Sequence, residues 1–327
     1  MLSIVIPTRA RTGKVYAQIQ RVNAQLKGHK TLIKPELLVV ENHSTDLLDH
    51  QKLREFGWEI KTEQVDFGGN HNFCNAIISA SSEYVWILGD HHVLDANAVS
   101  KVYAAIEKYK PDCLIINELG LNSKFLAPQS QRELFESVDG LGPLIHTSGY
   151  IVKRKTFSKY CLDSILYQST FVPQLVFVLN ALKKGKLILV EDNLFSNHIT
   201  ETKHKTELYM VGVFVCMGLN QIEIFLEASA YKSWAKLIQR TRRNWITPKG
   251  IIYELAKHFH DNRELRSRLF NLSLYVRHLG LFRFCFYKVI GNIILNVDGF
   301  TQIYARTYEN LRGYSVSFRP SIKFFED

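Results

Sequence analysis

Short apolar runs alternate with amphipathic segments over the first 200 residues of the chain. The apolar runs are rich in β-branched and aromatic residues, which is typical of strands buried on both faces. They predict strands at residues 2–6, 36–40, 58–61, 84–88, 113–117, 149–153 and 186–191. The segments between them repeat apolar residues at helical spacing and predict helices at residues 14–27, 47–56, 72–80, 96–109 and 170–183. This alternation predicts an α/β fold with a doubly wound, mostly parallel sheet.

Two stretches depart from the alternation. Residues 118–145 are rich in turn-forming residues, and we assign no element there. From about residue 205 the strand pattern stops, and helical spacing predicts helices at residues 207–228, 231–243, 248–259, 262–278 and 281–296. We therefore divide the chain into an α/β domain, residues 1–203, and a helical C-terminal region, residues 204–327. We also expect Asp95 to be the N-cap of the helix at residues 96–109.

Polar residues gather where three of the predicted strands end. Tyr84–Leu88 runs into Gly89-Asp90-His91-His92, the first strand into Pro7-Thr8-Arg9, and the second into a polar turn from Glu41 to Asp46. The carboxyl ends of parallel strands share one edge of a sheet, where open α/β folds bind their ligands. A short polar turn is also an ordinary strand or helix cap, so each turn alone could be structural. The three turns together favour a ligand site.

The first two turns resemble motifs of the inverting glycosyltransferases of family 2, which have the GT-A fold. That family begins with a strand ending in Pro-Thr, as Ser3–Thr8 does here. Its second strand runs into an acidic-x-x-Ser-x-Asp turn, which is matched by Glu41, Ser44 and Asp46. The acidic residue of that turn is usually aspartate, and glutamate can accept the same hydrogen bonds.

Two later motifs follow in the order that the family has. A glycine and a helical asparagine six residues later are matched by Gly69 and Asn75. In an abequosyltransferase-like subgroup, an aromatic-rich strand then ends in Gly-Asp-Asp-Asp-x-Leu, and this chain has Gly-Asp-His-His-Val-Leu at residues 89–94. The resemblance covers about residues 2–200. It implies a GT-A fold and a nucleotide-sugar site that includes Pro7, Thr8, Arg9, Glu41, Ser44, Gly69, Asn75 and Asp90.

His91 stands where the family has its principal metal-binding aspartate. That aspartate holds Mn²⁺ or Mg²⁺ against the donor diphosphate, where the metal neutralises charge on the leaving nucleotide. Since imidazole is a poor Mg²⁺ ligand, the resemblance implies a divalent metal with Mn²⁺ preferred, held by His91, Asp90 and a late histidine, His198. Two alternatives are a protonated histidine that replaces the metal, and a chain that has lost catalysis.

Inverting transfer needs a general base that takes the proton of the acceptor hydroxyl. The family carries it as a carboxylate near the start of the helix predicted at residues 170–183, but Ser169–Gln174 contains none. Asp163 is our first candidate for the base, and we name it with Asp90 as catalytic. Glu191, Asp192 and His146 are the alternatives, and any of them could be an ordinary solvated residue.

Charge is distributed unevenly along the chain. Residues 1–200 carry 22 Lys and Arg against 20 Asp and Glu, and residues 201–327 carry 19 against 11. Within residues 232–288 there are 13 basic and 3 acidic residues, interleaved with aromatic ones. This pattern is typical of helices that lie on an anionic membrane, or of a helical bundle with solvated charges. No stretch reaches the ~18 uncharged apolar residues of a membrane span. We see no nucleic-acid recognition motif and expect no nucleic-acid partner.

The sequence leads to one favoured hypothesis and two alternatives. The favoured one is an enzyme that moves a sugar, with inversion, from a nucleotide-sugar donor to a hydroxyl of a lipid-linked surface glycan such as lipopolysaccharide or capsule. The second is a non-catalytic binding or scaffold subunit of the same fold. The third is a nucleotidyltransferase, which would need a glycine-rich loop after the first strand, where only Gly13 is found. Five scattered cysteines and no evident secretory signal favour a cytoplasmic protein, alternatively one bound peripherally to the inner face of the cell membrane.

Overall fold

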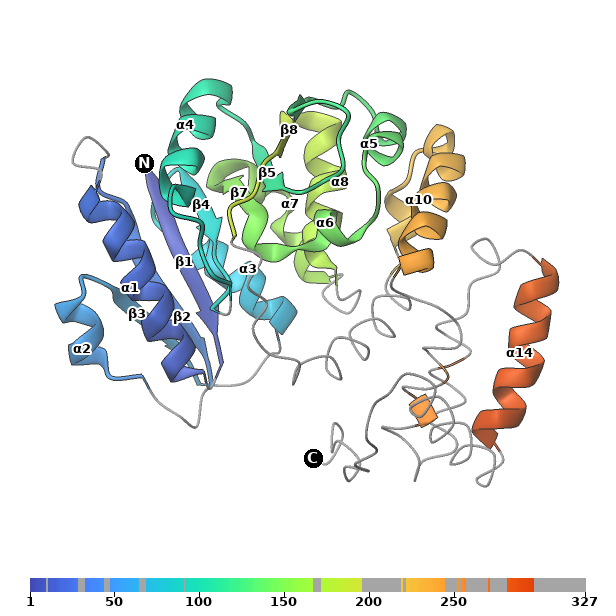
Figure 1. Cartoon of the computed structure of the whole chain (residues 1–327), viewed down its shortest axis with the longest axis horizontal. Coiled ribbons are helices and arrows are strands. Elements are labelled where there is room, and N and C mark those ends of the chain that lie inside the picture. Colours follow the sequence, from blue (N-terminus) through green and yellow to red (C-terminus); the bar gives the residue numbers. More distant parts are fainter. Residues whose placement is uncertain are drawn as a thin grey trace. The chain divides into compact units, whose positions relative to one another are not determined.

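The computed structural model describes residues 1–9, 11–28, 33–43, 48–64, 69–90, 92–166, 172–195, 219, 222–244, 252, 255–256, 270 and 281–296 (Figure 1). The chain divides into two compact units. The first comprises Met1–Thr200 and Phe225–Ser233, and the second comprises Glu201–Ile224 and Trp234–Asp327. The first unit therefore extends close to the predicted domain boundary and also includes a short segment from beyond it.

Strands and helices alternate through the first unit. In chain order they are β1 (Leu2–Thr8), α1 (Thr12–Gly28), β2 (Glu36–Asn42), α2 (His50–Glu55), β3 (Glu59–Glu63), α3 (Gly69–Ser79), β4 (Tyr84–Ile87), α4 (Ala98–Tyr109), β5 (Cys113–Asn117), β6 (Phe125–Leu126), α5 (Gln131–Ser137), α6 (Gly142–Ile145), the 3₁₀ turn η1 (Thr147–Gly149), β7 (Tyr150–Lys153), α7 (Arg154–Leu166), α8 (Pro173–Lys184) and β8 (Leu187–Glu191). The short 3₁₀ turns η4 (Glu223–Phe225) and η5 (Ala228–Ala230) come later in the chain.

Within the described residues the strands form one eight-stranded mixed sheet. Its order is β3-β2-β1-β4-β7-β5-β8-β6. Strands β3, β2, β1 and β4 are parallel, as are β5 and β8, whereas β7 runs antiparallel to both β4 and β5. The prediction of an α/β fold with a doubly wound, mostly parallel sheet is confirmed. An antiparallel β7 has a consequence for the site, because its first residues lie at the edge where β1 and β4 end.

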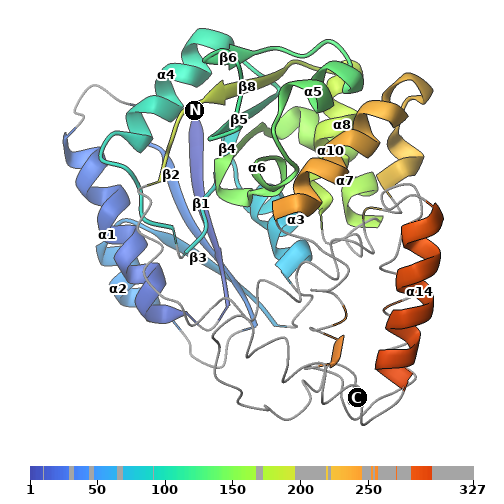
Figure 2. The same ribbon diagram turned by 45° about the vertical axis from the view of Figure 1, so that its right-hand side comes forward.

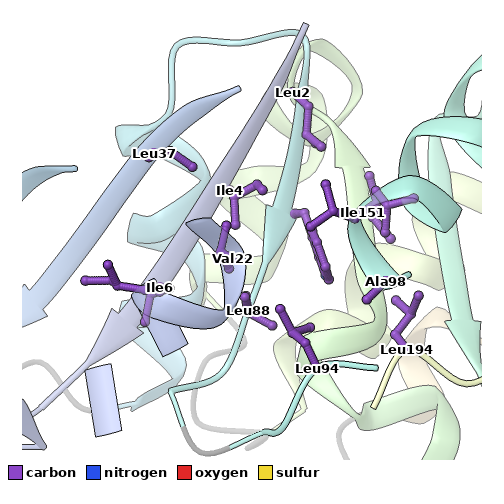
Figure 3. Close-up of a cluster of buried hydrophobic side chains, with 14 of the residues drawn as sticks. Leu2, Ile4, Ile6, Val22, Leu37, Leu88, Leu94, Ala98, Ile151 and Leu194 are labelled. Carbon is purple, nitrogen blue, oxygen red and sulfur yellow. The ribbon is translucent and has the colours of Figure 1, made fainter. Parts of the chain in front are cut away.

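The two faces of the sheet are covered by different helices (Figures 1 and 2). Alternate strand residues such as Leu2, Ile4 and Ile6 pack with Val22 of α1 and Ala98 of α4 in one buried cluster (Figure 3). Residues between them in the sequence point to the other face, because side chains alternate along a strand. There α3 contacts β1, β2 and β4, and also packs against α7. Strands with both faces buried explain the continuous apolar runs of the sequence.

Helix α4 begins later than predicted, and Asp95 is not its N-cap. Leu94 forms an antiparallel bridge with Phe195, and the backbone N–H of Asp95 donates to the carbonyl of Leu194 at 2.9 Å. The chain is therefore still extended at Asp95, and Asn97 is the residue that precedes the helix. The Asp95 carboxylate forms an ion pair with Lys101 at 3.3 Å instead.

Residues 118–145 contain elements that the sequence analysis did not assign. Ser130 is the N-cap of α5, and its hydroxyl accepts a hydrogen bond from the backbone N–H of Glu133 at 3.1 Å. Ser130 and Glu133 have the spacing of a capping box, so a sequence signal for this helix was present and was overlooked. Helix α6 and η1 follow directly and lead into β7.

Two helices are described towards the C-terminus, α10 (Tyr231–Asn244) and α14 (Leu281–Asn296). They agree with the helices predicted at residues 231–243 and 281–296. On α14, Gly291 and Leu295 are buried, whereas Phe286, Val289, Ile290 and Ile293 are exposed. The other predicted helices of this region lie mostly outside the described residues. In the described part of the chain, no helix is long and apolar enough to cross a membrane.

Candidate active site

Asp90 is the centre of a polar cluster at the carboxyl ends of β1 and β4. Its side chain is only 4% exposed. Thr8, the last residue of β1, donates a hydrogen bond from Oγ1 to Asp90 Oδ2 at 2.9 Å. Arg11 donates from Nη1 to Asp90 Oδ1 at 3.2 Å. Both carboxylate oxygens of a buried acid are thereby hydrogen-bonded, which a buried charge requires.

Backbone structure places each of these three residues. The ladder between β1 and β4 continues to Leu88, whose N–H donates to the carbonyl of Val5 at 2.9 Å, so the chain turns at Gly89 and Asp90. Arg11 directly precedes α1, and its carbonyl accepts the N–H groups of Lys14 and Val15. Sequence analysis missed Arg11 because the helix was predicted to begin at residue 14. A signal existed, since an arginine before the first helix of such a fold lies at the ligand edge.

Glu41 lies beside this cluster on the neighbouring strand. It is paired with Thr8 in the register of β1 and β2 and is buried, 1% exposed. Thr62 of β3 lies 3.4 Å away and donates to the Glu41 carboxylate. Asn72 of α3 is also buried and donates from Nδ2 to the carbonyl of Thr8 at 3.3 Å, while its Oδ1 has no hydrogen-bond partner among the described residues. An acidic and an amide group therefore flank Thr8.

Other predicted donor-site residues lie near this edge but make different contacts. Asn75 donates from Nδ2 to the carboxylate of Glu63 at 2.6 Å, which holds the end of β3 against α3. Gly69 is the first residue of α3. Pro7 is partly buried within β1, and Arg9 is exposed just after it. Their role in binding a nucleotide sugar stays a prediction.

A second cluster lies two residues further along the chain and contains paired histidines. His92 Nε2 and His146 Nε2 are 2.8 Å apart, and the two rings have centroids 4.5 Å apart. His92 Nδ1 is 2.7 Å from Ser148 Oγ, which also accepts the N–H of Gly89 at 2.8 Å. Phe195 packs against both imidazoles, with centroid distances of 5.0 and 5.5 Å. His146 was considered only as a candidate base, and His92 was given no role.

The loop that carries His146 is anchored on both sides. Gln174 of α8 donates to the carbonyl of Ile145 at 2.6 Å, and the Tyr150 hydroxyl donates to the carbonyl of Leu144. Burial raises the pKa of Tyr150 well above its usual value, with the neighbouring Cys113 adding to the shift, so the hydroxyl keeps its proton. Trp86 of β4 donates from Nε1 to the carbonyl of Ser148 at 2.8 Å. These bonds come from three elements and hold the loop before β7 in one position.

The remaining predicted residues divide into two groups. Ser44, His91 and His198 lie outside the described residues. Asp163 lies in α7, and its side chain is likewise outside what the structure describes. Of the alternative bases, Glu191 accepts the N–H groups of Leu119 and Leu121, and Asp192 forms an ion pair with Lys101 at 2.8 Å. These two carboxylates have structural partners. The contacts of the described residues do not identify the general base, which stays a prediction.

The described side chains offer limited ligands for the metal that the resemblance implies. Among them, no group of three or more His, Cys, Asp and Glu residues is arranged to hold an ion. Asp90 has its oxygens engaged by Thr8 and Arg11. His92 and His146 instead bring two imidazole nitrogens together, which suits a transition-metal ion and not Mg²⁺.

Comparisons with known proteins agree with this geometry. The profile of Glycosyl transferase family 2 matches residues 3–141, which include β1, β4, Arg11 and both Asp90 and His92. Residues 3–141, less than half of the chain, are therefore similar to this family. A search of curated protein sequences finds no match for the chain. This likeness favours sugar transfer as the activity.

Solved structures with the same fold bind nucleotide sugars. S. aureus TarS residues 1–349, in complex with UDP-GlcNAc, superposes with a TM-score of 0.52 at 15% identity, covering 100% of this chain and 99% of that one. The mannosyltransferase PcManGT from Pyrobaculum calidifontis, in complex with GDP-Man and Mn²⁺, has a TM-score of 0.52 at 10% identity, covering 96% and 88%. At these identities the likeness establishes the fold. The α/β part of the chain therefore has a GT-A-type architecture, followed by helical structure.

Proposed function

We propose that the protein transfers a sugar from a nucleotide-sugar donor to a hydroxyl of a surface glycan, with inversion at the anomeric carbon. The observation that carries this proposal is the cluster of Thr8, Arg11 and Asp90 at the carboxyl edge of a family 2 domain. TarS and PcManGT, which share the fold, are solved with UDP-GlcNAc and GDP-Man. The Gly-Asp-His-His-Val-Leu motif at residues 89–94 supports a relationship with the abequosyltransferase-like subgroup.

Each residue of the cluster has a task in this proposal. Arg11 has five N–H donors, and its bond to Asp90 uses one, so the others can bind the donor diphosphate. Asp90 holds the guanidinium in place and can accept a ribose hydroxyl with a remaining lone pair. Glu41, buried on β2, is positioned to accept a hydrogen bond from the nucleoside. Pro7, Arg9, Ser44, Gly69 and Asn75 complete the proposed donor site.

The reaction is a direct displacement. The acceptor oxygen forms a bond to the anomeric carbon as the bond from that carbon to the diphosphate oxygen breaks, and the nucleoside diphosphate leaves. The acceptor proton passes to a base, for which Asp163 is our proposal. A divalent ion bound at this edge would supply positive charge for the leaving diphosphate.

A purified enzyme assay tests the proposal. The protein is incubated with a panel of UDP- and GDP-sugars, release of the nucleoside diphosphate is measured, and donor binding is followed by calorimetry. We expect at least one donor to bind and to be hydrolysed or transferred, and Arg11→Ala to weaken that binding. Arg132→Ala is the matched control, because Arg132 is an exposed arginine whose partner is the exposed Glu136. If no donor binds and no donor releases its nucleoside diphosphate, the proposed enzyme activity is refuted.

One observation favours a second candidate, a non-catalytic subunit that binds nucleotide sugars. Histidines replace the carboxylates of the metal motif, while Asp90 and Arg11 remain paired. Such a protein would bind a donor in the calorimeter but release no nucleotide at any metal concentration. The same experiment therefore separates the two candidates.

We further propose that the acceptor is lipid-linked and that the C-terminal helices contact an anionic membrane through residues 232–288. On α10, Trp234, Leu237 and Ile238 are buried, whereas Lys232 and Lys236 are exposed. On α14, Phe286 and Ile290 are exposed beside Lys288. Exposed basic and apolar side chains together are typical of membrane-surface helices. Sedimentation with vesicles of anionic lipid at low salt, reversed at high salt, is the expected result. Failure to sediment would contradict the contact.

A further inference from the structure

Two imidazole nitrogens face each other in the histidine cluster. His92 Nε2 and His146 Nε2 are 2.8 Å apart. One imidazole N–H donates to the lone pair of the other ring at this distance, and a metal ion could replace that proton by taking both lone pairs. Two nitrogens at about 2.0–2.1 Å from one ion lie about 2.9 Å apart at a right angle and about 3.4 Å apart at the tetrahedral angle, so the pair would open slightly around an ion.

The opposite nitrogen of His92 is held as in metal sites. His92 Nδ1 lies 2.7 Å from Ser148 Oγ, and Ser148 Oγ is fixed by the N–H of Gly89. Histidines that bind metals commonly donate their second ring N–H to such an oxygen, which fixes the tautomer and orients the ring. With Nδ1–H donating to Ser148, His92 Nε2 presents its lone pair towards His146.

The surroundings keep this pair in place and leave Asp90 out of it. Phe195 covers both rings, and Gln174 and Tyr150 hold the loop that carries His146. Asp90, the nearest described carboxylate in the sequence, is occupied by Thr8 and Arg11. Within this cluster, the ligands available to a cation are therefore the ring nitrogens of His92 and His146.

We propose that His92 and His146 bind one divalent transition-metal ion through their Nε2 atoms, oriented by Ser148. Neither residue belongs to the set predicted from the sequence, which was Asp90, His91 and His198. Imidazole pairs select Mn²⁺, Co²⁺, Ni²⁺ or Zn²⁺ over Mg²⁺. The further statement that the donor diphosphate fills open positions on the ion rests on the proposed function, whereas binding of the ion alone does not.

The test measures metal binding without any nucleotide sugar. Full-length protein freed of metal by chelation is titrated with Zn²⁺, Co²⁺ and Mg²⁺ by calorimetry, and the Co²⁺ form is followed by visible absorption. We expect one Co²⁺ or Zn²⁺ per chain, no saturable Mg²⁺ binding at the same concentrations, and a visible Co²⁺ spectrum without a thiolate charge-transfer band. His146→Ala and His92→Ala should each weaken Co²⁺ binding by ~100-fold or more, since loss of a supporting partner alone costs 10–100-fold.

Controls keep the result interpretable. His50→Ala removes an exposed histidine on α2 and should leave Co²⁺ affinity unchanged. Thermal melting of each metal-free variant checks that it folds, and His146→Gln serves if His146→Ala does not. No stoichiometric binding, or binding that survives both histidine variants, would overturn the metal site and leave a pair that shares a proton. Donor binding measured separately shows whether the proposed function fails as well, so the two failures are distinguishable.

Discussion

Asp90 and His92 are two residues apart, yet they belong to different environments. Asp90 is buried and paired with Thr8 of β1 and with Arg11 before α1. His92 is half-buried and contacts Ser148 and His146, which precede β7. The first environment satisfies a negative charge with hydrogen-bond donors, and the second presents nitrogen lone pairs. One short turn thus contributes to both the proposed donor site and the proposed metal site.

The different surroundings of Asp90 and His92 indicate which of the two positions can accept another residue type. A carboxylate that is already neutralised by an arginine has little to offer a metal ion, so Asp90 supports the guanidinium. The side chain two residues later, His92, faces the imidazole of His146. Under the two proposals above, histidine in place of aspartate there would change the ligand offered to a metal ion and leave the contacts of Asp90 unchanged.

The largest expected effect follows from separating Asp90 from Arg11. Asp90→Ala and Arg11→Ala should each weaken donor binding by ~30-fold, because each removes a hydrogen bond between charged groups, which contributes about 2 kcal/mol where one partner, Asp90, is buried. The double variant should be little worse than either single one, since both remove the same interaction. Calorimetry with the best donor measures this. Independent, multiplicative losses would show that the pair does not act as a unit.

Gly89→Ala should disturb both environments at once. A Cβ at residue 89 would lie 2.7 Å from His92 Nδ1 and 2.7 Å from Ser148 Oγ, so the turn must shift. We expect a loss of about 1–3 kcal/mol in the free energy of unfolding, as is usual for overpacking. Urea denaturation measures it, with Gly28→Ala as the control because a Cβ there meets nothing within 4 Å. Equal stability of the two variants would contradict the tight packing of the turn.

Ser148→Ala removes a hydroxyl that contacts both His92 Nδ1 and the N–H of Gly89, and its main effect should fall on the histidine environment. Without the hydroxyl, His92 loses the partner of Nδ1 and its ring is less well oriented. We expect Co²⁺ affinity to fall by ~10-fold, at the low end for loss of a supporting partner, while donor binding in the absence of metal stays unchanged. Ser148→Thr keeps the hydroxyl and should retain most of the affinity. A parallel loss of metal-free donor binding would mean that the two environments are coupled.

The smallest expected effect concerns the support of the His146 loop. Gln174→Ala removes the hydrogen bond to the carbonyl of Ile145 and should cost about 1 kcal/mol in stability. Co²⁺ affinity should fall only a few-fold, because Tyr150 still holds Leu144. Thermal melting and the Co²⁺ titration measure the two quantities. A loss of metal affinity as large as that of His146→Ala would place Gln174 among the principal determinants of the site.

Much of the fold could be predicted from the sequence because strands buried on both faces produce unmistakable apolar runs. Residues 84–88 and 113–117 are examples, and both are strands in the structure. Asp95 was misassigned because its role depends on a distant segment, the chain around Leu194 and Phe195. Local capping preference could not anticipate that pairing.

Of the two clusters in the candidate site, only the one around Asp90 could be predicted from the sequence. Thr8 and Asp90 follow consecutive parallel neighbours in the sheet, so their proximity followed from strand order in a doubly wound fold. The partnership of His92 with His146 spans 54 residues and depends on β7 entering between β4 and β5 in the opposite direction. Hydrophobic periodicity carries no information about such an insertion.

The antiparallel β7 also bears on how the protein could change over evolution or by design. Because β7 runs against β4, the chain that enters it arrives at the binding edge, and residues 118–149 connect β5 to that point. This connection contains α5, α6 and the short edge strand β6, which pairs with β8, whereas Thr8 and Glu41 lie on β1 and β2. Exchanging the connection between related chains should therefore alter the residues that face the proposed donor site while leaving Thr8, Glu41 and Asp90 in place.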